Sequence, residues 1–222
     1  YKRQRYHGDP VGSLADLTSF SFFPTKNLTT AEGGALVTND DDLATRARRF
    51  KNHGLVRDKK LQRYPDEGPW HQEVHSFGIN YRLPDVLCAL GSSQLQRLDD
   101  FVARRAEIKR TYDEALSNLD GVEIPFAPAE AEPAWHLYPL RVPAERRKAI
   151  FESLREQGIG VQVNYIPAYW HPVFEDLGYK RGMCPVAEDY YRREISLPMF
   201  PDLRDSDVER VIEALRKALA NA

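Results

Sequence analysis

The chain has 222 residues, and its 31 lysines and arginines against 33 aspartates and glutamates give a formal net charge of −2. This length suits one large domain or two small ones, and the balanced charge, without a long basic block, excludes nucleic acid as an expected partner. No apolar run approaches the roughly 18 residues that cross a bilayer, and Cys88 and Cys184 lack metal-type spacing, so we expect a soluble, cytoplasmic protein with free thiols, no metal and no membrane partner.

Two predicted strands flank a single lysine. Residues 17–23, rich in β-branched and aromatic side chains, predict a short buried strand, and residues 35–38 predict a second one after a Gly-Gly pair. Lys26 then lies on a tight loop between them. A lysine amine has an ordinary pKa of about 10.4, but a held, partly desolvated amine reacts with a carbonyl group or an aldehyde cofactor. The alternative is a solvated surface charge, the usual state of a loop lysine.

The next segments predict helices around an irregular region. Residues 40–51 have the composition of a short helix with aspartates at its start. Residues 53–76 are polar, aromatic and irregular, which is typical of a functional loop near a substrate entrance or of a disordered surface insertion. A helix beginning near Pro84 and another over residues 100–119 carry apolar stripes, which we interpret as core and dimer packing.

A segment rich in proline, alanine and glutamate, residues 121–133, indicates a crossing to a second domain. We therefore divide the chain into residues 1–122 and 123–222. The elements predicted beyond the crossing are a strand at 136–142, a helix at 144–156 that ends at Gly158, a strand at 161–167, a helical segment at 188–193, a short strand at 195–199 and an amphipathic helix at 205–220.

Two long motifs carry a family resemblance. Residues 19–40 read SFSFFPTKNLTTAEGGALVTND, and residues 77–95 read FGINYRLPDVLCALGSSQL. They resemble the cofactor-lysine segment and the second signature of the pyridoxal-phosphate (PLP) sugar aminotransferases called DegT/DnrJ/EryC1/StrS. The likeness runs through nearly the whole chain. It is greatest to enzymes of the pseudaminic acid route, which aminate C4 of a UDP-linked 4-keto-6-deoxy-N-acetylhexosamine.

This resemblance implies a fold-type I α/β protein, here part of the large domain plus a small α+β domain, that works as a homodimer with shared active sites. It implies PLP as cofactor, a nucleotide sugar as substrate and an amino acid, glutamate, as donor. Relatives that aminate a dTDP or GDP sugar are the alternative within the family. A non-catalytic fragment or relative of the family is the alternative from another functional class, although Lys26 speaks against the dehydratases, which have His at that place.

Three residues match cofactor-binding positions of the family. The resemblance implies that Lys26 is the covalent anchor of PLP and also moves a proton, that Ser21 hydrogen-bonds the cofactor phosphate, and that Asn80 reaches the phosphate of the partner subunit's site. Without the resemblance, Ser21 is a satisfied strand hydroxyl and Asn80 a turn residue.

The expected substrate contacts come from two segments and remain open in detail. Tyr169 stands where members usually have His, and Phe23 where the pseudaminic acid branch has His, which leaves the sugar uncertain. Aromatic side chains here stack on a sugar or pack internally. We expect Arg82 to form an ion pair with Asp85 or Glu73 or else to bind a substrate anion. The candidate substrate-binding residues are Tyr81, Arg82, Tyr165, Tyr169 and His171.

The opening residues 1–18 resemble family sequence that lies just downstream of an aspartate that pairs with the pyridine nitrogen of PLP. We therefore expect a C-terminal fragment that lacks this aspartate and is inactive by itself.

Overall fold

The computed structural model describes residues 4–221, so residues 1–3 of the opening segment and residue 222 lie outside it. The chain forms two compact units. The first contains residues 4–98 and 130–133, and the second contains residues 99–129 and 134–221. Within the described residues, no helix is long and apolar enough to cross a membrane.

The first unit begins with a small antiparallel sheet. Strand β1 (Arg5–Tyr6) pairs with β2 (Asp9–Pro10) on one side and with β7 (Ala131–Glu132) on the other, in the order β2-β1-β7. A short 3₁₀ helix, η1 (Val11–Ser13), follows. The predicted crossing at residues 121–133 thus contains a strand that returns to the first unit.

The lysine segment forms a second antiparallel pair. Strand β3 (Thr18–Ser21) runs against β4 (Gly34–Val37), with Thr18 opposite Val37 and Ser21 opposite Gly34. Both predicted strands are confirmed. The expected burial of the first is wrong, because β4 is its only neighbouring strand among the described residues and, of its four side chains, only that of Phe20 is buried.

Two helices of this unit agree with the sequence. Helix α1 (Asp41–Phe50) begins at Asp40, whose carboxylate accepts the Leu43 N–H at 2.9 Å, and Arg48 and Arg49 lie in its last turn, where positive charge suits the helix dipole. Helix α2 (Asp85–Gln96) follows Pro84.

The region between these helices is more ordered than we predicted. Strand β5 (Leu55–Val56) pairs antiparallel with β6 (Glu73–Val74), and η2 (Lys59–Leu61) lies between them. The Glu73 carboxylate accepts the main-chain N–H groups of Arg63 and Tyr64 at 2.7 and 2.6 Å, which ties the connecting segment to the hairpin. Residues 55–74, here called the β5–β6 hairpin, are therefore not an irregular loop.

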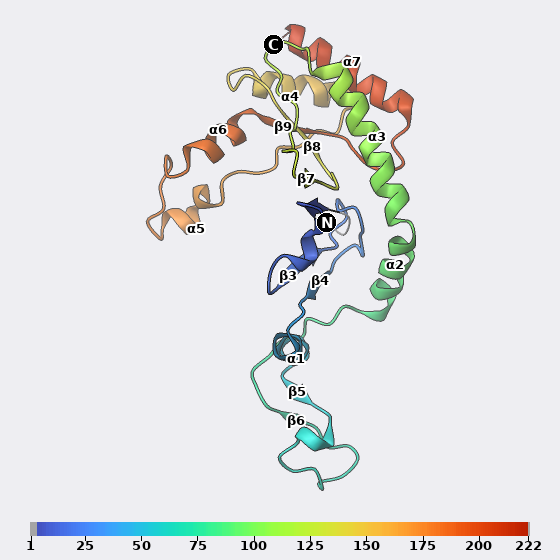
Figure 1. Cartoon of the computed structure of the whole chain (residues 1–222). Coiled ribbons are helices and arrows are strands. Elements are labelled where there is room, and N and C mark those ends of the chain that lie inside the picture. Colours follow the sequence, from blue (N-terminus) through green and yellow to red (C-terminus); the bar gives the residue numbers. More distant parts are fainter. Residues whose placement is uncertain (1–3, 222) are drawn as a thin grey trace. The chain divides into compact units, whose positions relative to one another are not determined.

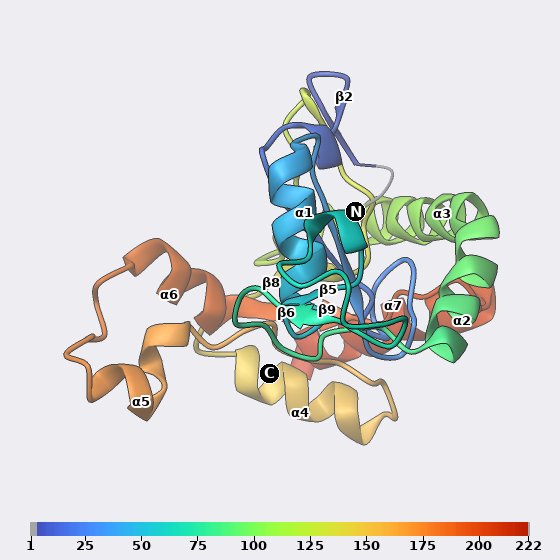
Figure 2. The ribbon, with the colours of Figure 1, turned by 90° about the horizontal axis from the view of Figure 1, so that it is seen from below.

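The second unit packs three helices on one pair of strands. Strand β8 (Tyr138–Arg141) runs antiparallel to β9 (Glu194–Leu197), with Tyr138 opposite Leu197. Helices α3 (Leu98–Leu116), α4 (Arg147–Glu156) and α7 (Asp205–Asn221) supply most of the remaining core, and α4 lies along α7 (Figures 1 and 2). The central buried side chains are Ile108, Tyr112, Leu116, Tyr138, Leu140, Ile150, Leu154, Ile195, Val211 and Leu215.

Helix α3 packs in the core of the second unit, whereas we predicted that it belongs to the first domain, before the boundary at 122/123. The division of the whole protein into residues 1–122 and 123–222 stays a prediction.

The segment between α4 and β9 extends away from the second unit's core in both views. It holds η3 (Ala168–Trp170), α5 (Pro172–Glu175) and α6 (Pro185–Arg193) (Figures 1 and 2). The strand predicted at residues 161–167 is wrong: pairing is limited to a bridge between Gln162 and Ser196. It stops because the Asn164 N–H donates to the Glu194 side chain, at 2.6 Å, instead of to a neighbouring backbone.

Candidate functional site

The loop that carries Lys26 is closed by its own main chain. The Lys26 N–H donates to the Phe23 carbonyl at 2.9 Å and forms a tight turn. The main chain of Phe22 holds the remainder of the loop. Its N–H donates to the Gly33 carbonyl, and its carbonyl accepts both the Thr30 N–H and the Thr29 hydroxyl, at 2.9 to 3.0 Å. These bonds fix the backbone on both sides of Lys26.

Buried side chains next to Lys26 anchor the loop to the rest of the first unit. Asn27, Leu28 and Thr30 are buried, whereas Lys26 itself is half-buried. The Thr30 hydroxyl donates to the Glu32 carbonyl at 2.7 Å, so Glu32 contributes to loop structure through its main chain. The loop therefore presents Lys26 from a packed base, which limits the positions that its amine reaches.

Lys26 and Ser21 line the same small hollow. The other lining residues are Phe20, Phe22, Asn27, Leu28 and Leu98. The Ser21 Oγ accepts the Phe23 N–H at 3.3 Å and, among the described residues, donates its own hydrogen to no acceptor. An amine and a hydroxyl donor on one hollow suit an aldehyde cofactor with a phosphate group.

Asn80 lies on a stretch tied to the end of α1. Ile79 N–H donates to the Phe50 carbonyl at 2.8 Å, Tyr81 N–H donates to the Lys51 carbonyl at 2.9 Å, and Asn52 faces Asn80 in an isolated bridge. The Asn80 side chain is exposed and hydrogen-bonds no described residue. Its backbone is thus fixed while its amide remains available.

Arg82 does not form the expected ion pair. Its Nη1 donates to the Asn52 Oδ1 at 2.7 Å, and among the described residues it contacts neither Asp85 nor Glu73. The prediction fails for Glu73 because that carboxylate is already occupied by two main-chain N–H groups and by His71 and His75. Burial opposes its ionisation, but these hydrogen bonds lower the pKa of Glu73 to about 2.

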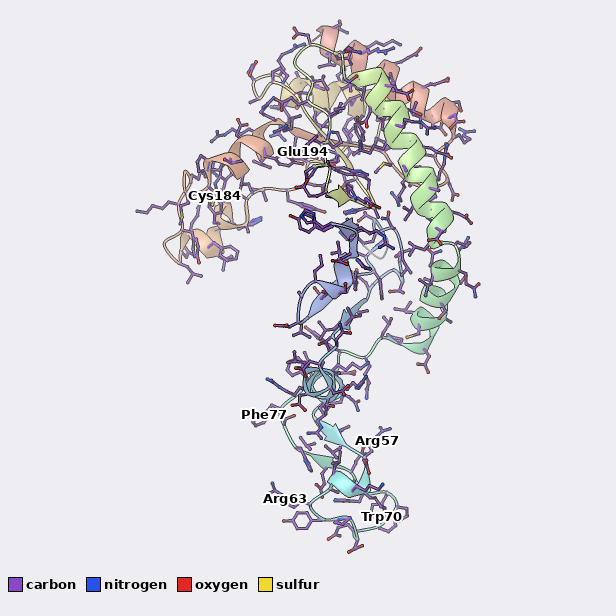
Figure 3. All side chains as sticks on the ribbon, viewed as in Figure 1. Arg57, Arg63, Trp70, Phe77, Cys184 and Glu194 are labelled. Carbon is purple, nitrogen blue, oxygen red and sulfur yellow. The ribbon has the colours of Figure 1, made fainter. Side chains whose placement is uncertain are left out.

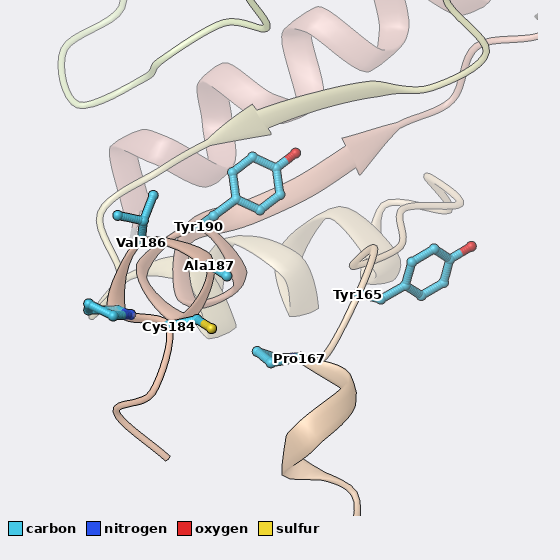
Figure 4. Close-up of a pocket in the computed structure, with 7 residues that line it drawn as sticks. Tyr165, Pro167, Cys184, Val186, Ala187 and Tyr190 are labelled. Carbon is cyan, nitrogen blue, oxygen red and sulfur yellow. The ribbon is translucent and has the colours of Figure 1, made fainter. Parts of the chain in front are cut away.

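In the second unit, Tyr165 borders an open apolar hollow of about 640 Å³ (Figure 4). Tyr165 is 72% exposed, and Pro167, Cys184 and Tyr190 lie on other sides of the hollow. His171 is exposed at the start of α5. Tyr165 and His171 are therefore accessible to a ligand, as expected for substrate contacts.

Tyr169 instead forms part of an internal network around Glu188, which the sequence did not reveal. The buried Glu188 carboxylate accepts the Tyr169 hydroxyl at 2.6 Å and the indole N–H of Trp170 at 3.4 Å, and it pairs with Arg192 at 3.3 Å. The Tyr169 bond lowers the pKa of Glu188 although burial opposes this, while burial and Glu188 raise the pKa of Tyr169 to about 12. Tyr169 is thus a hydrogen-bond donor at neutral pH and not a base.

A second buried carboxylate, Glu194, holds the start of the Tyr165 segment. It is fully buried and accepts the Asn164 N–H and the Ser196 hydroxyl at 2.6 and 2.5 Å. Burial raises the pKa of Glu194. An acid surrounded by core residues in β9 leaves no periodic signal, so no sequence pattern singles Glu194 out.

We expect Glu194→Gln to change how stability depends on pH. Because the folded-state pKa of Glu194 lies above its unfolded value, the native state binds this proton more tightly. Its stabilising contribution is complete below the ordinary glutamate pKa of about 4.3 and is lost as pH rises through the folded value. The variant lacks this loss, so its unfolding free energy relative to wild type should increase from acid to neutral pH in urea titrations. Exposed Glu156→Gln is the control; a pH-independent difference for Glu194→Gln would refute the argument.

The DegT/DnrJ/EryC1/StrS aminotransferase family model matches residues 3–216. The chain belongs to this family. Among curated relatives, the spore coat polysaccharide biosynthesis protein SpsC of Bacillus subtilis is 40% identical over 96% of this chain and 56% of its own length. The UDP-4-amino-4,6-dideoxy-N-acetyl-beta-L-altrosamine transaminase of Campylobacter jejuni is 36% identical over 95% of this chain and 54% of its own length.

Solved structures of aminotransferases show the same fold. PseC of Helicobacter pylori, an aminotransferase involved in the biosynthesis of pseudoaminic acid, has a TM-score of 0.90 at 31% identity and covers all of this chain with 58% of its own. The PLP form of Spr1654 from Streptococcus pneumoniae has a TM-score of 0.89 at 28% identity, over 99% of this chain and 56% of its own. The fold-type I α/β assignment is confirmed, and relatives bind PLP.

The chain spans about half the length of the relatives it matches. The altrosamine transaminase is one of several relatives of similar identity, and SpsC is slightly more identical. The comparisons therefore assign the chain to the family but not to the pseudaminic acid branch within it.

Proposed function

We propose that the whole protein uses PLP to transfer an amino group from glutamate to C4 of a UDP-linked 4-keto-6-deoxy-N-acetylhexosamine. The observation that carries this proposal is the half-buried Lys26 on a loop closed by its own main chain, with the Ser21 hydroxyl on the same hollow, in a chain of the aminotransferase family. The proposed working form is a homodimer whose two sites each use residues of both subunits.

Each cofactor residue has a distinct role in this proposal. When bound, PLP supplies an electron sink for the carbanion charge that develops during amino transfer. Lys26 anchors it covalently and, once released, carries a proton to and from the reacting carbon. Ser21 donates its hydroxyl hydrogen to the phosphate, and Asn80 of the partner subunit donates its amide to the same group.

The substrate contacts are proposed from exposure and from relatives. Tyr81, Tyr165 and His171 are exposed, and the Arg82 guanidinium keeps further donors beyond the one used by Asn52. Tyr169 contributes indirectly, because Glu188 holds its hydroxyl. The Campylobacter relative, a transaminase of a UDP-linked amino sugar, supports the UDP sugar.

A second candidate is amination of another keto sugar nucleotide, linked to dTDP or GDP. SpsC, whose name specifies no nucleotide, is 40% identical to this chain, against 36% for the Campylobacter transaminase of a UDP sugar, so identity alone does not favour the UDP link. Turnover measured across a panel of UDP, dTDP and GDP keto sugars separates the two, since the preferred nucleotide shows the largest kcat/KM.

The anchor is tested by chemical trapping. Borohydride makes a lysine–PLP link permanent, so peptide mapping of the reduced whole protein should place the pyridoxyl group on the peptide that contains Lys26. The reason is that the loop limits the reach of this amine and pairs it with Ser21 on one hollow. Consistent labelling of a different lysine would end the assignment.

A further inference from the structure

Residues 164–188, here called the arm, have almost no apolar core of their own. Between positions 168 and 188, Trp170 is the only buried apolar side chain and Glu188 is the only buried charged one. Glu194 lies at the inner end of the arm, and Cys184 lies in its outer part (Figure 3). Because little apolar area is buried in the outer part, its conformation depends on a few polar contacts.

The Glu188 carboxylate joins three parts of the arm. Its Oε1 accepts the Tyr169 hydroxyl and the Trp170 indole N–H from η3, at 2.6 and 3.4 Å. The same oxygen accepts the main-chain N–H of Gly182, in the turn before α6. Its Oε2 pairs with Arg192 of α6 at 3.3 Å. One side chain therefore connects the outgoing and the returning halves of the arm.

Trp170 has two further contacts with the returning half. The Arg181 guanidinium lies 4.3 Å from the centroid of the indole ring. The Tyr191 ring of α6 meets the indole edge to face, with centroids 5.4 Å apart. These contacts keep the indole in the orientation in which its N–H reaches Glu188.

Glu188 is not suited to exchange a proton with a substrate. Its hydrogen bond from Tyr169 lowers the pKa of the carboxyl although burial opposes this, so the group is ionised at neutral pH. The residue is only 3% exposed, and both oxygens already have partners. Any contribution to a reaction therefore acts through the residues that Glu188 holds.

The stretch from Asn164 to His171 is held at both ends. At the inner end, the Asn164 N–H donates to the Glu194 carboxylate at 2.6 Å. At the outer end, Glu188 holds η3. Tyr165, on this stretch, is exposed and borders the apolar hollow of Figure 4, and His171 is also exposed. Release of the outer end would let both side chains change position.

We propose that Glu188 is a positioning residue that holds Tyr165 and His171 where they meet the sugar nucleotide. It acts through the η3 residues that it hydrogen-bonds and does not touch the substrate. The substrate role of the arm rests on the proposed function. In that reaction glutamate gives up its amino group in one half-reaction, and C4 of the sugar receives it in the other. Only the second should depend on Glu188, because the first uses Lys26 and no arm residue.

Hydrogen exchange in the whole protein tests the holding role. Glu188→Ala should speed amide exchange at Gly182 and in η3 by about tenfold, because a charged acceptor is lost. The matched control is Asp189→Ala, which removes the next carboxylate of α6. Asp189 pairs with Arg193 at 3.7 Å, as Glu188 does with Arg192, but holds no residue of η3. Glu188→Gln keeps the side-chain shape and should show a smaller change in the same direction, so the test stands if the alanine variant does not fold.

Half-reaction kinetics test the substrate role. Glu188→Ala should raise KM for the keto sugar nucleotide by about tenfold and leave the rate of the glutamate half-reaction within about twofold of wild type. Tyr169→Phe removes one of the same hydrogen bonds. Its effect on KM should therefore be smaller in the Glu188→Gln background than in wild type.

Three results would overturn the proposal: unchanged exchange in Glu188→Ala, an equal change in Asp189→Ala, or equal loss in the two half-reactions. Wild-type amino transfer together with an unchanged KM in Glu188→Ala would end this inference alone. A wild-type protein that takes no amino group from glutamate would end the proposed function and the substrate role of the arm with it, while hydrogen exchange would still decide whether Glu188 holds the arm.

Discussion

Lys26→Ala in the whole protein is expected to lower the rate of amino transfer by about 10⁴-fold or more, because one side chain supplies both the covalent anchor and the proton carrier. The fold should remain, since the loop is closed by main-chain bonds at Phe22 and by buried Thr30. Turnover with a keto sugar nucleotide measures the effect, and circular dichroism with thermal melting checks the fold.

Two variants sharpen this result. Lys26→Arg keeps the positive charge but cannot act as the nucleophile, so it should be as inactive as the alanine variant. Lys217→Ala, at an exposed position of α7, should retain full activity. Substantial turnover by either Lys26 variant would show that the amine is not the catalyst.

Mixed dimers provide the second large effect. If Asn80 serves the partner's site, Lys26→Ala and Asn80→Ala homodimers are both impaired, yet a hybrid dimer contains one site with both residues intact. Random exchange of subunits makes half of the dimers hybrid, so specific activity should recover to about a quarter of wild type. Activity is measured before and after mixing.

Subunit exchange is verified independently, for example by a fluorescence transfer signal between labelled subunits. If exchange is complete and activity stays at the level of the separate variants, Lys26 and Asn80 serve the same chain's site, and the proposed sharing of sites is wrong.

Local signals explain why the lysine segment could be predicted from sequence. The turn at Lys26 and the strands on each side form within one continuous segment, residues 18–37, and their main-chain hydrogen bonds all lie inside it. The same holds for α1, where Asp40 caps a helix that follows immediately. Short-range patterns were enough for these elements.

The features that could not be predicted depend on hydrogen bonds of individual side chains whose partners the local pattern does not specify. The β5–β6 hairpin is stabilised by the Glu73 carboxylate, which accepts the main-chain N–H groups of Arg63 and Tyr64. A single glutamate in a polar stretch does not predict these bonds. The strand expected at 161–167 fails because Glu194, thirty residues beyond Asn164, captures its N–H. Arg82 binds Asn52, and another network already occupies Glu73, one of its two expected partners.

The position of Gly33 restricts how the lysine segment can vary during evolution or in a mutant library. Its φ is +144°, and a Cβ there would come 2.5 Å from the Thr30 Oγ1 and 2.8 Å from a methyl carbon of Leu83. Any larger residue would strain the backbone and displace Leu83, which lies just before α2. Substitutions at neighbouring positions therefore cannot easily compensate. Thr25, exposed on the turn, has no such limit. Tolerance to mutation should therefore change sharply within eight positions of one loop.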